Sequence, residues 1–411
     1  WNTYDLGRIN ILKEYANHIW STHPDTYIIL EHFADNSEET ELANFGFMLW
    51  GNMHHEYSEA SMGYGGDFTS AVYSNRGWAF PHLVSYMESH DEERCMYKNL
   101  NYGNYNESYD IRNFDIALDR LKLAYTFMML VPGPKMLWQF GELGYNYPIN
   151  LCEDGSSVSE SCRTSPKPSA WSFYQDSSRL ELYNLVCDIN YLKLKIDVFS
   201  SQNFTYDLSG DIKRMTFSNG QKNATIIGNF GLTDASILPQ FQHTGLWFDY
   251  LSKTTIIEEN LDNYFLLSPG EYRIYTDFQV HKIIDVTFQV NMSNEEISTN
   301  GVYISGDFQN WEPGSILMSD ENDDGIYSVT LSLKADSSYQ YKFINGNAWG
   351  MDETVLGDCG VGNRILNTLD SDTILGPVCF NSCYNCSATS QTSQLEQTVY
   401  FPEGWSMFSL F

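Results

Sequence analysis

Basic side chains are scarce in this sequence, and so are long apolar runs. The 411 residues include 23 lysines and arginines against 53 aspartates and glutamates, a formal net charge of -30 at pH 7. Nucleic-acid binding needs a basic surface that faces the phosphates, so we expect no nucleic-acid partner. The longest apolar candidate, residues 123–138, is interrupted by Pro132, Gly133 and Pro134, so we predict no membrane span.

A complete set of zinc ligands is also missing. The only Cys-x-x-Cys motif is Cys383–Cys386, and no histidine pair follows it, which favours a disulfide over a metal site. Cysteine pairs in loops are typical of proteins from oxidising compartments, so we predict a secreted or cell-surface protein. We expect Cys359 to pair with Cys379 and Cys383 with Cys386. A further candidate pair, Cys152 and Cys162, flanks a Ser-rich loop, and we expect Cys95 and Cys187 to be buried thiols.

The chain begins without an initiator methionine and ends in an apolar, strand-like run. We therefore interpret the sequence as a fragment of a longer polypeptide. The Ser/Thr/Gln-rich composition near residue 390 predicts a linker over residues 387–398. Residues 399–411 would then be the start of a truncated further domain.

Hydrophobic periodicity divides the rest into three blocks. Helical spacing over residues 5–20, 114–130 and 180–194 alternates with apolar, strand-like runs, which predicts an α/β fold with a parallel sheet for residues 1–203. Short alternating runs separated by Gly, Asn and Asp predict an antiparallel β-sandwich over residues 204–278 and a second over residues 283–386.

One acidic residue stands at the end of a strand candidate. The segment Tyr27–Phe33 has four apolar residues, two of them β-branched, directly before Glu31, which is typical of a strand buried on both faces. A carboxyl group at such a strand end, partly shielded from water, tends to keep its proton, as a general acid must. The alternative is that Glu31 only begins a loop or caps the next helix.

A second polar group follows the strand candidate at residues 80–87. By the period of two, Glu88 and His90 should share one face, with Asp91 at the strand end. A histidine and a carboxylate placed there can bind a sugar's hydroxyls and stabilise a cationic transition state. The alternative is a charged, solvated loop with a structural histidine.

Taken in order, these segments and the later Gly133–Glu142 resemble the second half of the α-amylase family of retaining glycoside hydrolases, family 13. The resemblance covers residues 1–277 and implies that residues 1–203 are the C-terminal part of a (β/α)8 barrel. It implies that Glu31 is the acid/base, that His90 and Asp91 bind substrate and stabilise the transition state, and that Gln139 and Glu142 line or support the site.

The family's nucleophilic aspartate has no counterpart here. It lies on the fourth barrel strand, so the resemblance places it upstream of Trp1, together with most of the family's calcium ligands. Calcium is therefore expected from the resemblance, while we assign no metal ligand in this sequence. Asp5 precedes a helix and fits an N-cap better than a nucleophile.

Aromatic residues make up 15% of the chain, and flat rings suit stacking on sugars. Trp50 and Tyr64 lie in or beside a Gly-containing segment, residues 51–66, that we expect to form a loop over the barrel mouth. His54 and His55 in that loop should face solvent or substrate.

The third block resembles starch-binding modules of the early-set type. The segments that carry the likeness are Gly301–Trp311 and Tyr339–Trp349. Trp311 and Trp349 could stack on glucose units there, with Lys342 or Asn347 binding hydroxyls. The alternative is a structural appendage, because a fold does not imply a function. We interpret the acidic run at residues 320–325 as a hairpin turn.

The function implied is hydrolysis of an α-glucan such as starch, glycogen or a maltooligosaccharide, by double displacement. Two alternatives remain: a 4-α-glucanotransferase or branching-type transglycosylase on the same scaffold, and a non-catalytic surface protein that binds glucan. We expect the fragment by itself to be inactive.

Overall fold

The computed structural model describes residues 3–357 and 359–386, so the predicted linker 387–398 and the start of a further domain at 399–411 lie outside the described residues. The chain forms two compact units, with unit 1 ending at Val280 and unit 2 beginning at His281. No helix among the described residues is both long and apolar enough to cross a membrane.

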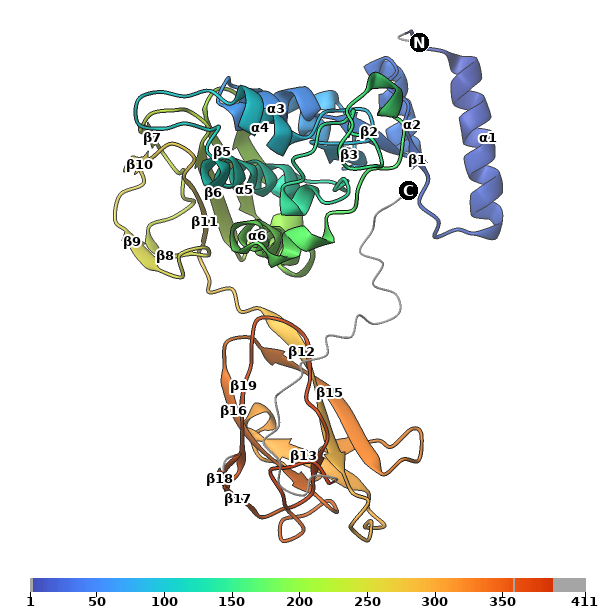
Figure 1. The fold of residues 1–411 in the computed structure, drawn as a ribbon, viewed down its shortest axis with the longest axis vertical. Coiled ribbons are helices and arrows are strands. Elements are labelled where there is room, and N and C mark those ends of the chain that lie inside the picture. The colour runs from blue at the N-terminus through green and yellow to red at the C-terminus, as the bar shows by residue number, and fades with distance from the viewer. Residues whose placement is uncertain (1–2, 358, 387–411) are drawn as a thin grey trace. The chain divides into compact units, whose positions relative to one another are not determined.

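The first part of unit 1 alternates strand and helix, as the periodicity predicts (Figure 1). Strands β1, β2 and β3 pair in parallel in that order. A single parallel bridge from Ser85 to Lys135 continues the sheet, so the strand expected after residue 133 is reduced to one bridge. The elements are α1 (Leu6–Thr22), β1 (Ile29–Leu30), α2 (Asn36–Phe45), β2 (Met48–Asn52), α3 (His54–Met62), β3 (Leu83–Tyr86), α4 (Cys95–Tyr102), α5 (Phe114–Leu130) and α6 (Ser177–Lys195).

Short 3₁₀ helices connect these elements. They are η1 (Phe68–Ala71), η2 (Tyr73–Arg76), η3 (Gly141–Leu143), η4 (Glu160–Cys162), η5 (Trp171–Gln175) and η6 (Asp197–Ser200). The loop expected over residues 51–66 is mostly α3, which begins directly after β2. Local polar side chains start the long helices: the Asp5 carboxylate accepts from the backbone N–H of Gly7, which confirms Asp5 as the N-cap of α1.

The strand that ends at Glu31 differs from the prediction. It is only two residues long and lies at the edge of the sheet, with β2 as its partner. Tyr27 is 78% exposed and Ile29 41% exposed, so burial on both faces is wrong for this chain. The physical reason is that β1 lies at the edge of the sheet, because the described residues supply a partner strand on one side only.

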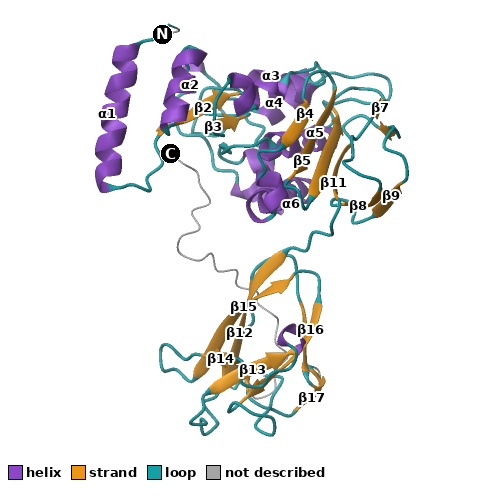
Figure 2. Cartoon of the chain, turned by 180° about the vertical axis from the view of Figure 1, so that it is seen from behind, coloured by secondary structure: helices purple, strands orange, loops and turns teal. Residues whose placement is uncertain are grey.

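Antiparallel strands complete unit 1 and lie on the side away from α1 (Figure 2). A six-stranded sheet has the order β4-β5-β6-β11-β8-β9, and β7 pairs with β10. The strands are β4 (Phe204–Asp207), β5 (Ile212–Ser218), β6 (Asn223–Asn229), β7 (Ala235–Ile237), β8 (Gly245–Asp249), β9 (Thr255–Glu258), β10 (Phe265–Leu267) and β11 (Tyr272–Thr276).

The two faces of this sheet bury different cores, as the period of two requires. Ile226 of β6 packs into the cluster that contains α5 and α6, whereas Ile227 packs with Trp247 on the opposite face. Gly228 allows α5 to approach closely, because a Cβ there would lie 2.6 Å from the ring of Phe127. Whether residues 1–203 and 204–278 are separate domains stays a prediction.

Unit 2 has two main sheets that share one core. Strand β12 lies between β15 and β20, with β21 also paired to β12, and the second sheet has the order β14-β13-β16-β19. Phe288 of β12 and Ile304 and Phe343 of the other sheet meet in the core. The strands are β12 (Ile283–Asn291), β13 (Val302–Gly306), β14 (Ile316–Met318), β15 (Ile326–Lys334), β16 (Ser338–Ile344), β17 (Val355–Gly357), β18 (Gly360–Gly362), β19 (Arg364–Asn367), β20 (Thr373–Ile374) and β21 (Val378–Cys379); η7 (Asp307–Gln309) follows β13.

One of the three expected disulfide pairings is formed in the structure. Cys152 and Cys162 are bonded as expected. In unit 2 the pairs are Cys359–Cys383 and Cys379–Cys386, so both expected pairings are wrong. The reason is topological: β21 pairs Cys379 with Asn291 of β12, and the Cys386 sulfur lies 3.8 Å from the carbonyl oxygen of the same Asn291. Cys95 is buried as expected, but Cys187 is exposed.

Candidate functional site

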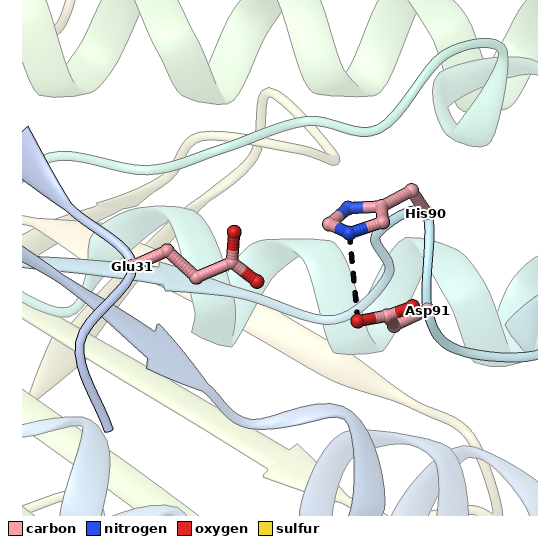
Figure 3. Close-up of side chains that lie close together, drawn as sticks. All are labelled: Glu31, His90 and Asp91. Atoms are coloured by element: carbon pink, nitrogen blue, oxygen red, sulfur yellow. Dashed lines mark ion pairs between the residues drawn. The ribbon is translucent and has the colours of Figure 1, made fainter. Parts of the chain in front are cut away.

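Glu31, His90 and Asp91 meet at the C-terminal ends of β1 and β3. A carboxylate oxygen of Glu31, a ring nitrogen of His90 and a carboxylate oxygen of Asp91 lie within 4.8 Å of one another. Figure 3 shows the Glu31 side chain extending from the end of β1 toward the loop that carries the other two residues. His90 Nε2 lies 3.4 Å from an Asp91 carboxylate oxygen. Parallel strands bring their carboxyl ends to one edge, which is why residues 60 positions apart converge.

All three side chains are open to water. The side chains of His90 and Asp91 are 48% and 61% exposed, and Glu31 is exposed as well. The expected shielding of Glu31 is therefore wrong for this chain, because β1 is an edge strand.

Two tryptophans border this group. The Trp50 ring on β2 lies 6.0 Å from the imidazole of His90 and 5.3 Å from the ring of Tyr86. Trp138 lies 6.0 Å from the same imidazole. Trp50, predicted as a substrate-binding residue, is thus beside the site, and Trp138 joins it from the segment after α5.

Other predicted residues lie elsewhere or act through the backbone. Tyr64 follows the C-terminal end of α3, a helix that starts right after β2 and so carries Tyr64 away from the strand ends. Gln139 is exposed, and its backbone oxygen accepts from Arg94 Nη2 at 2.9 Å. Glu142 lies in η3, and burial raises its pKa.

His54 is not directed to solvent or substrate. Its Nδ1 lies 2.7 Å from the backbone oxygen of Met87, which can only accept, so Nδ1 carries the proton. Burial lowers the pKa of His54, which keeps the ring neutral near pH 7. His54 therefore holds α3 against the end of β3.

Glu88 is a residue whose role the sequence pattern misses. It is buried, not paired on a face with the exposed His90. Its carboxylate accepts from the Cys95 N–H at 2.6 Å and from Arg94 Nη1 at 3.1 Å, across the loop that carries His90 and Asp91. The one available signal was a carboxylate directly after the apolar strand with an arginine six residues later.

The disulfide-closed loop also contacts this segment. Arg163, next to Cys162, donates to the backbone oxygen of Asp91. The Ile149 N–H donates to the Glu93 carboxylate at 2.8 Å. Two contacts therefore tie the loop around residues 149–163 to the segment that carries Asp91.

Calcium does not fit the residues present. Among the described residues, Glu31, His90 and Asp91 are the group that could hold an ion. They offer two carboxylates and an imidazole, whereas calcium takes about six to eight oxygen ligands. We therefore assign no step to calcium in this chain.

In unit 2 the two predicted tryptophans lie together. The rings of Trp311 and Trp349 are 6.3 Å apart between centroids, at an interplanar angle of 41°. Trp349 is 48% exposed, and Asn347 near it is exposed too. Lys342 instead pairs with Asp352 at 2.6 Å, so it is not directed to a ligand.

The acidic run at residues 320–325 closes a hairpin, as predicted. The Asp320 carboxylate accepts from the N–H of Asp324 at 3.2 Å and of Gly325 at 2.9 Å, between β14 and β15. These bonds account for the acid at the start of the turn.

Comparison with known proteins places the chain near α-amylases. No family model matches the sequence. An α-amylase from Niallia circulans is 26% identical over 178 residues, which are 42% of this chain and 13% of that protein.

Solved structures give likenesses of limited extent. An α-amylase from Anoxybacillus has a TM-score of 0.49 at 14% identity, covering 64% of this chain and 54% of the other. The α-amylase of Geobacillus thermoleovorans, solved with acarbose, has a TM-score of 0.49 at 13% identity. This likeness covers 65% of this chain and 57% of the other. A γ-cyclodextrin glucanotransferase from Bacillus clarkii has a TM-score of 0.42 at 12% identity. This likeness covers 89% of this chain and 70% of the other. The chain spans a little over half the length of the two amylase structures.

Proposed function

We propose that this chain, which is similar in sequence to an α-amylase, is part of a glycoside hydrolase of the α-amylase type and carries the acid/base side of a retaining α-glucan hydrolase. The observation that supports this proposal is the convergence of Glu31 with His90 and Asp91 from the ends of separate parallel strands. A lone carboxylate would fit many roles, but an acid opposite a histidine–carboxylate pair fits glycosidic bond cleavage.

The mechanism proposed is double displacement. Glu31 donates a proton to the leaving glycosidic oxygen while an aspartate from outside this chain attacks the anomeric carbon. Glu31 then takes a proton from the water that releases the sugar. His90 and Asp91 bind hydroxyl groups and stabilise the positive charge that develops on the sugar ring.

The open edge of β1 supports a site that is completed by further polypeptide. The apolar side chains of Tyr27 and Ile29 are exposed beside it, and so are Leu6, Ile11 and Tyr15 of α1. An unpaired, apolar strand edge is a template for pairing with another strand. Strands placed there would also exclude water from Glu31.

The test compares two polypeptides and one substitution. Residues 1–411 alone should release no reducing sugar from starch, whereas the chain extended upstream by its own coding sequence should do so. In that extended polypeptide, Glu31→Gln should lower kcat by about 10²- to 10⁴-fold, the usual contribution of general acid–base catalysis. Glu14→Gln, an exposed glutamate on α1, is the matched control and should leave kcat unchanged.

Turnover by residues 1–411, or an unchanged kcat for Glu31→Gln, would contradict the assignment. The transglycosylase alternative is separated by the products from maltooligosaccharides, because transfer makes chains longer than the substrate and hydrolysis does not.

A second function is favoured by unit 2. We propose that Trp311 and Trp349 form a platform for glucose units, because their rings are neighbours and that of Trp349 is about half exposed. Aromatic faces and hydroxyl-binding amides such as Asn347 suit a neutral polysaccharide. This function would remain if the chain had no catalytic role.

The disulfides bear on where the protein works. Three bonds are formed in the described residues, and such bonds persist in oxidising environments. We propose a secreted or cell-surface location, where a polymeric glucan is accessible.

A further inference from the structure

The position of Glu31 depends on few backbone contacts of its own strand. On its N-terminal side, β1 has only two residues, and Leu30 pairs with Leu49 of β2. The other edge of β1 has no strand partner among the described residues. The contacts that fix the chain on the C-terminal side of Glu31 therefore decide where its carboxyl group lies.

His32, the next residue, is held by a buried carboxylate. Its Nε2 lies 2.6 Å from Glu38 Oε1, in the first turn of α2. The Glu38 side chain is fully buried, while that of His32 is 11% exposed. This contact is therefore shielded from water, where a charge-assisted hydrogen bond is stronger than at the surface.

Glu38 is ionised and strongly held. Burial by itself raises its pKa, but hydrogen bonds from Arg8 and His32 bring the pKa down to about 2. Arg8 donates from Nε at 2.6 Å and from Nη2 at 2.7 Å, and the Asp5 N–H donates at 2.8 Å. Because an ionised carboxylate only accepts, His32 Nε2 carries the proton and donates it.

The neighbouring glutamate holds the same segment two residues later. Glu39 is 4% exposed, and its carboxylate accepts from the Ala34 N–H at 3.0 Å, with Arg76 at 3.4 Å. Between these two anchors Phe33 has a φ of 48°, which a non-glycine residue adopts only when its surroundings hold it. The turn directly after Glu31 is thus fixed at both ends by α2.

We infer that Glu38 is a positioning residue for the reaction, which holds Glu31 opposite His90 and Asp91 through the side chain of His32. This inference rests on the proposed function, in which Glu31 is the acid/base. A displacement of about 1 Å at a reacting group can lower the rate about 100-fold, so a loosened His32 should affect catalysis more than binding.

The main test is His32→Ala in the extended polypeptide. We expect kcat on maltooligosaccharides to fall by about 10- to 100-fold, with KM changed by less than about threefold. Glu38→Gln should behave in the same way. His32→Gln keeps an N–H donor on the side chain and should recover part of the lost kcat.

The matched control is Lys13→Ala. Lys13 also links α1 to α2, through Glu41 at 2.6 Å, but touches neither His32 nor Glu38. It should leave kcat and KM unchanged. Equal kcat for His32→Ala and the wild type would overturn the inference, as would an equal loss of kcat in Lys13→Ala.

The inference is also separable from the proposed function. If the extended wild-type polypeptide has no glucan turnover, the proposed function fails, and amide hydrogen exchange of residues 31–34 decides the positioning role. Faster exchange in His32→Ala but not in Lys13→Ala would support the anchor. Unchanged exchange in His32→Ala would overturn it.

Discussion

Replacing Trp349 by alanine should weaken glucan binding by a predictable amount. A tryptophan side chain buries about 150–250 Å² when it is fully covered. Trp349 is 48% exposed, so about 100 Å² remains for a ligand to cover. At about 25 cal/mol per Å², full cover is worth about 2.5 kcal/mol. A sugar that covers only one ring face gains about half of that.

These limits correspond to a Kd increase of between about 8- and 60-fold for Trp349→Ala, since about 1.4 kcal/mol is a tenfold change. The assay is titration of residues 1–411 with soluble amylose by calorimetry. Binding through unit 2 needs no complete barrel, so this measurement does not depend on turnover.

The matched control is Trp171→Ala. Trp171 in η5 is 64% exposed, so it offers more free surface than Trp349, but its neighbour at 5.0 Å is Phe140 and no second tryptophan. The Trp171→Ala variant should bind amylose with the same Kd as the wild type. An unchanged Kd for Trp349→Ala, or an equal loss in Trp171→Ala, would refute the platform.

Three further predictions concern unit 1. Arg120 is fully buried and donates to five backbone oxygens. Arg120→Met should therefore lower the free energy of unfolding by about 3–5 kcal/mol, measured by thermal melts. The control Arg112→Met changes an exposed arginine and should lower it by less than about 1 kcal/mol. Burial lowers the pKa of Lys213 to about 8, so between pH 8 and 10.5 the unfolded chain binds more protons than the folded one. The free energy of unfolding should therefore rise across that window by up to about 3 kcal/mol. Lys213→Met should flatten this rise, measured by urea titrations at several pH values. Arg163→Ala removes the contact to the Asp91 backbone and should lower kcat of the extended polypeptide severalfold, and an unchanged kcat would show that the contact has no positioning role.

The convergence of Glu31 with His90 and Asp91 could be predicted from the sequence. Apolar runs that end in polar residues mark strand ends, and parallel pairing brings those ends to one edge whatever the length of the crossover. The N-cap at Asp5 was equally predictable, because it depends on residues two and three positions away.

Other features depend on neighbours that local patterns do not contain. The run before Glu31 has the composition of a buried strand, yet its burial is decided by whether a strand lies on its free edge. The disulfide pairs of unit 2 follow from the pairing of β21 with β12, which residue spacing alone does not show. Glu38 looks like a solvated acid in the first turn of a helix, but it is buried and bonded to Arg8 of α1 and to His32.

The location of the few basic residues connects the composition with the choice of ligand. Arginines and lysines are normally exposed, but several here lie in the interior, where they donate to backbone oxygens or pair with buried acids. These buried residues are Arg94, Arg120, Arg179, Lys213 and Arg364. The surface therefore exposes still fewer positive charges than the 23 lysines and arginines of the sequence. Such a surface repels polyanions, whereas a neutral polysaccharide is neither attracted nor repelled by it. Recognition of a glucan must then come from rings and hydrogen bonds, which is what the tryptophans of the two units can provide.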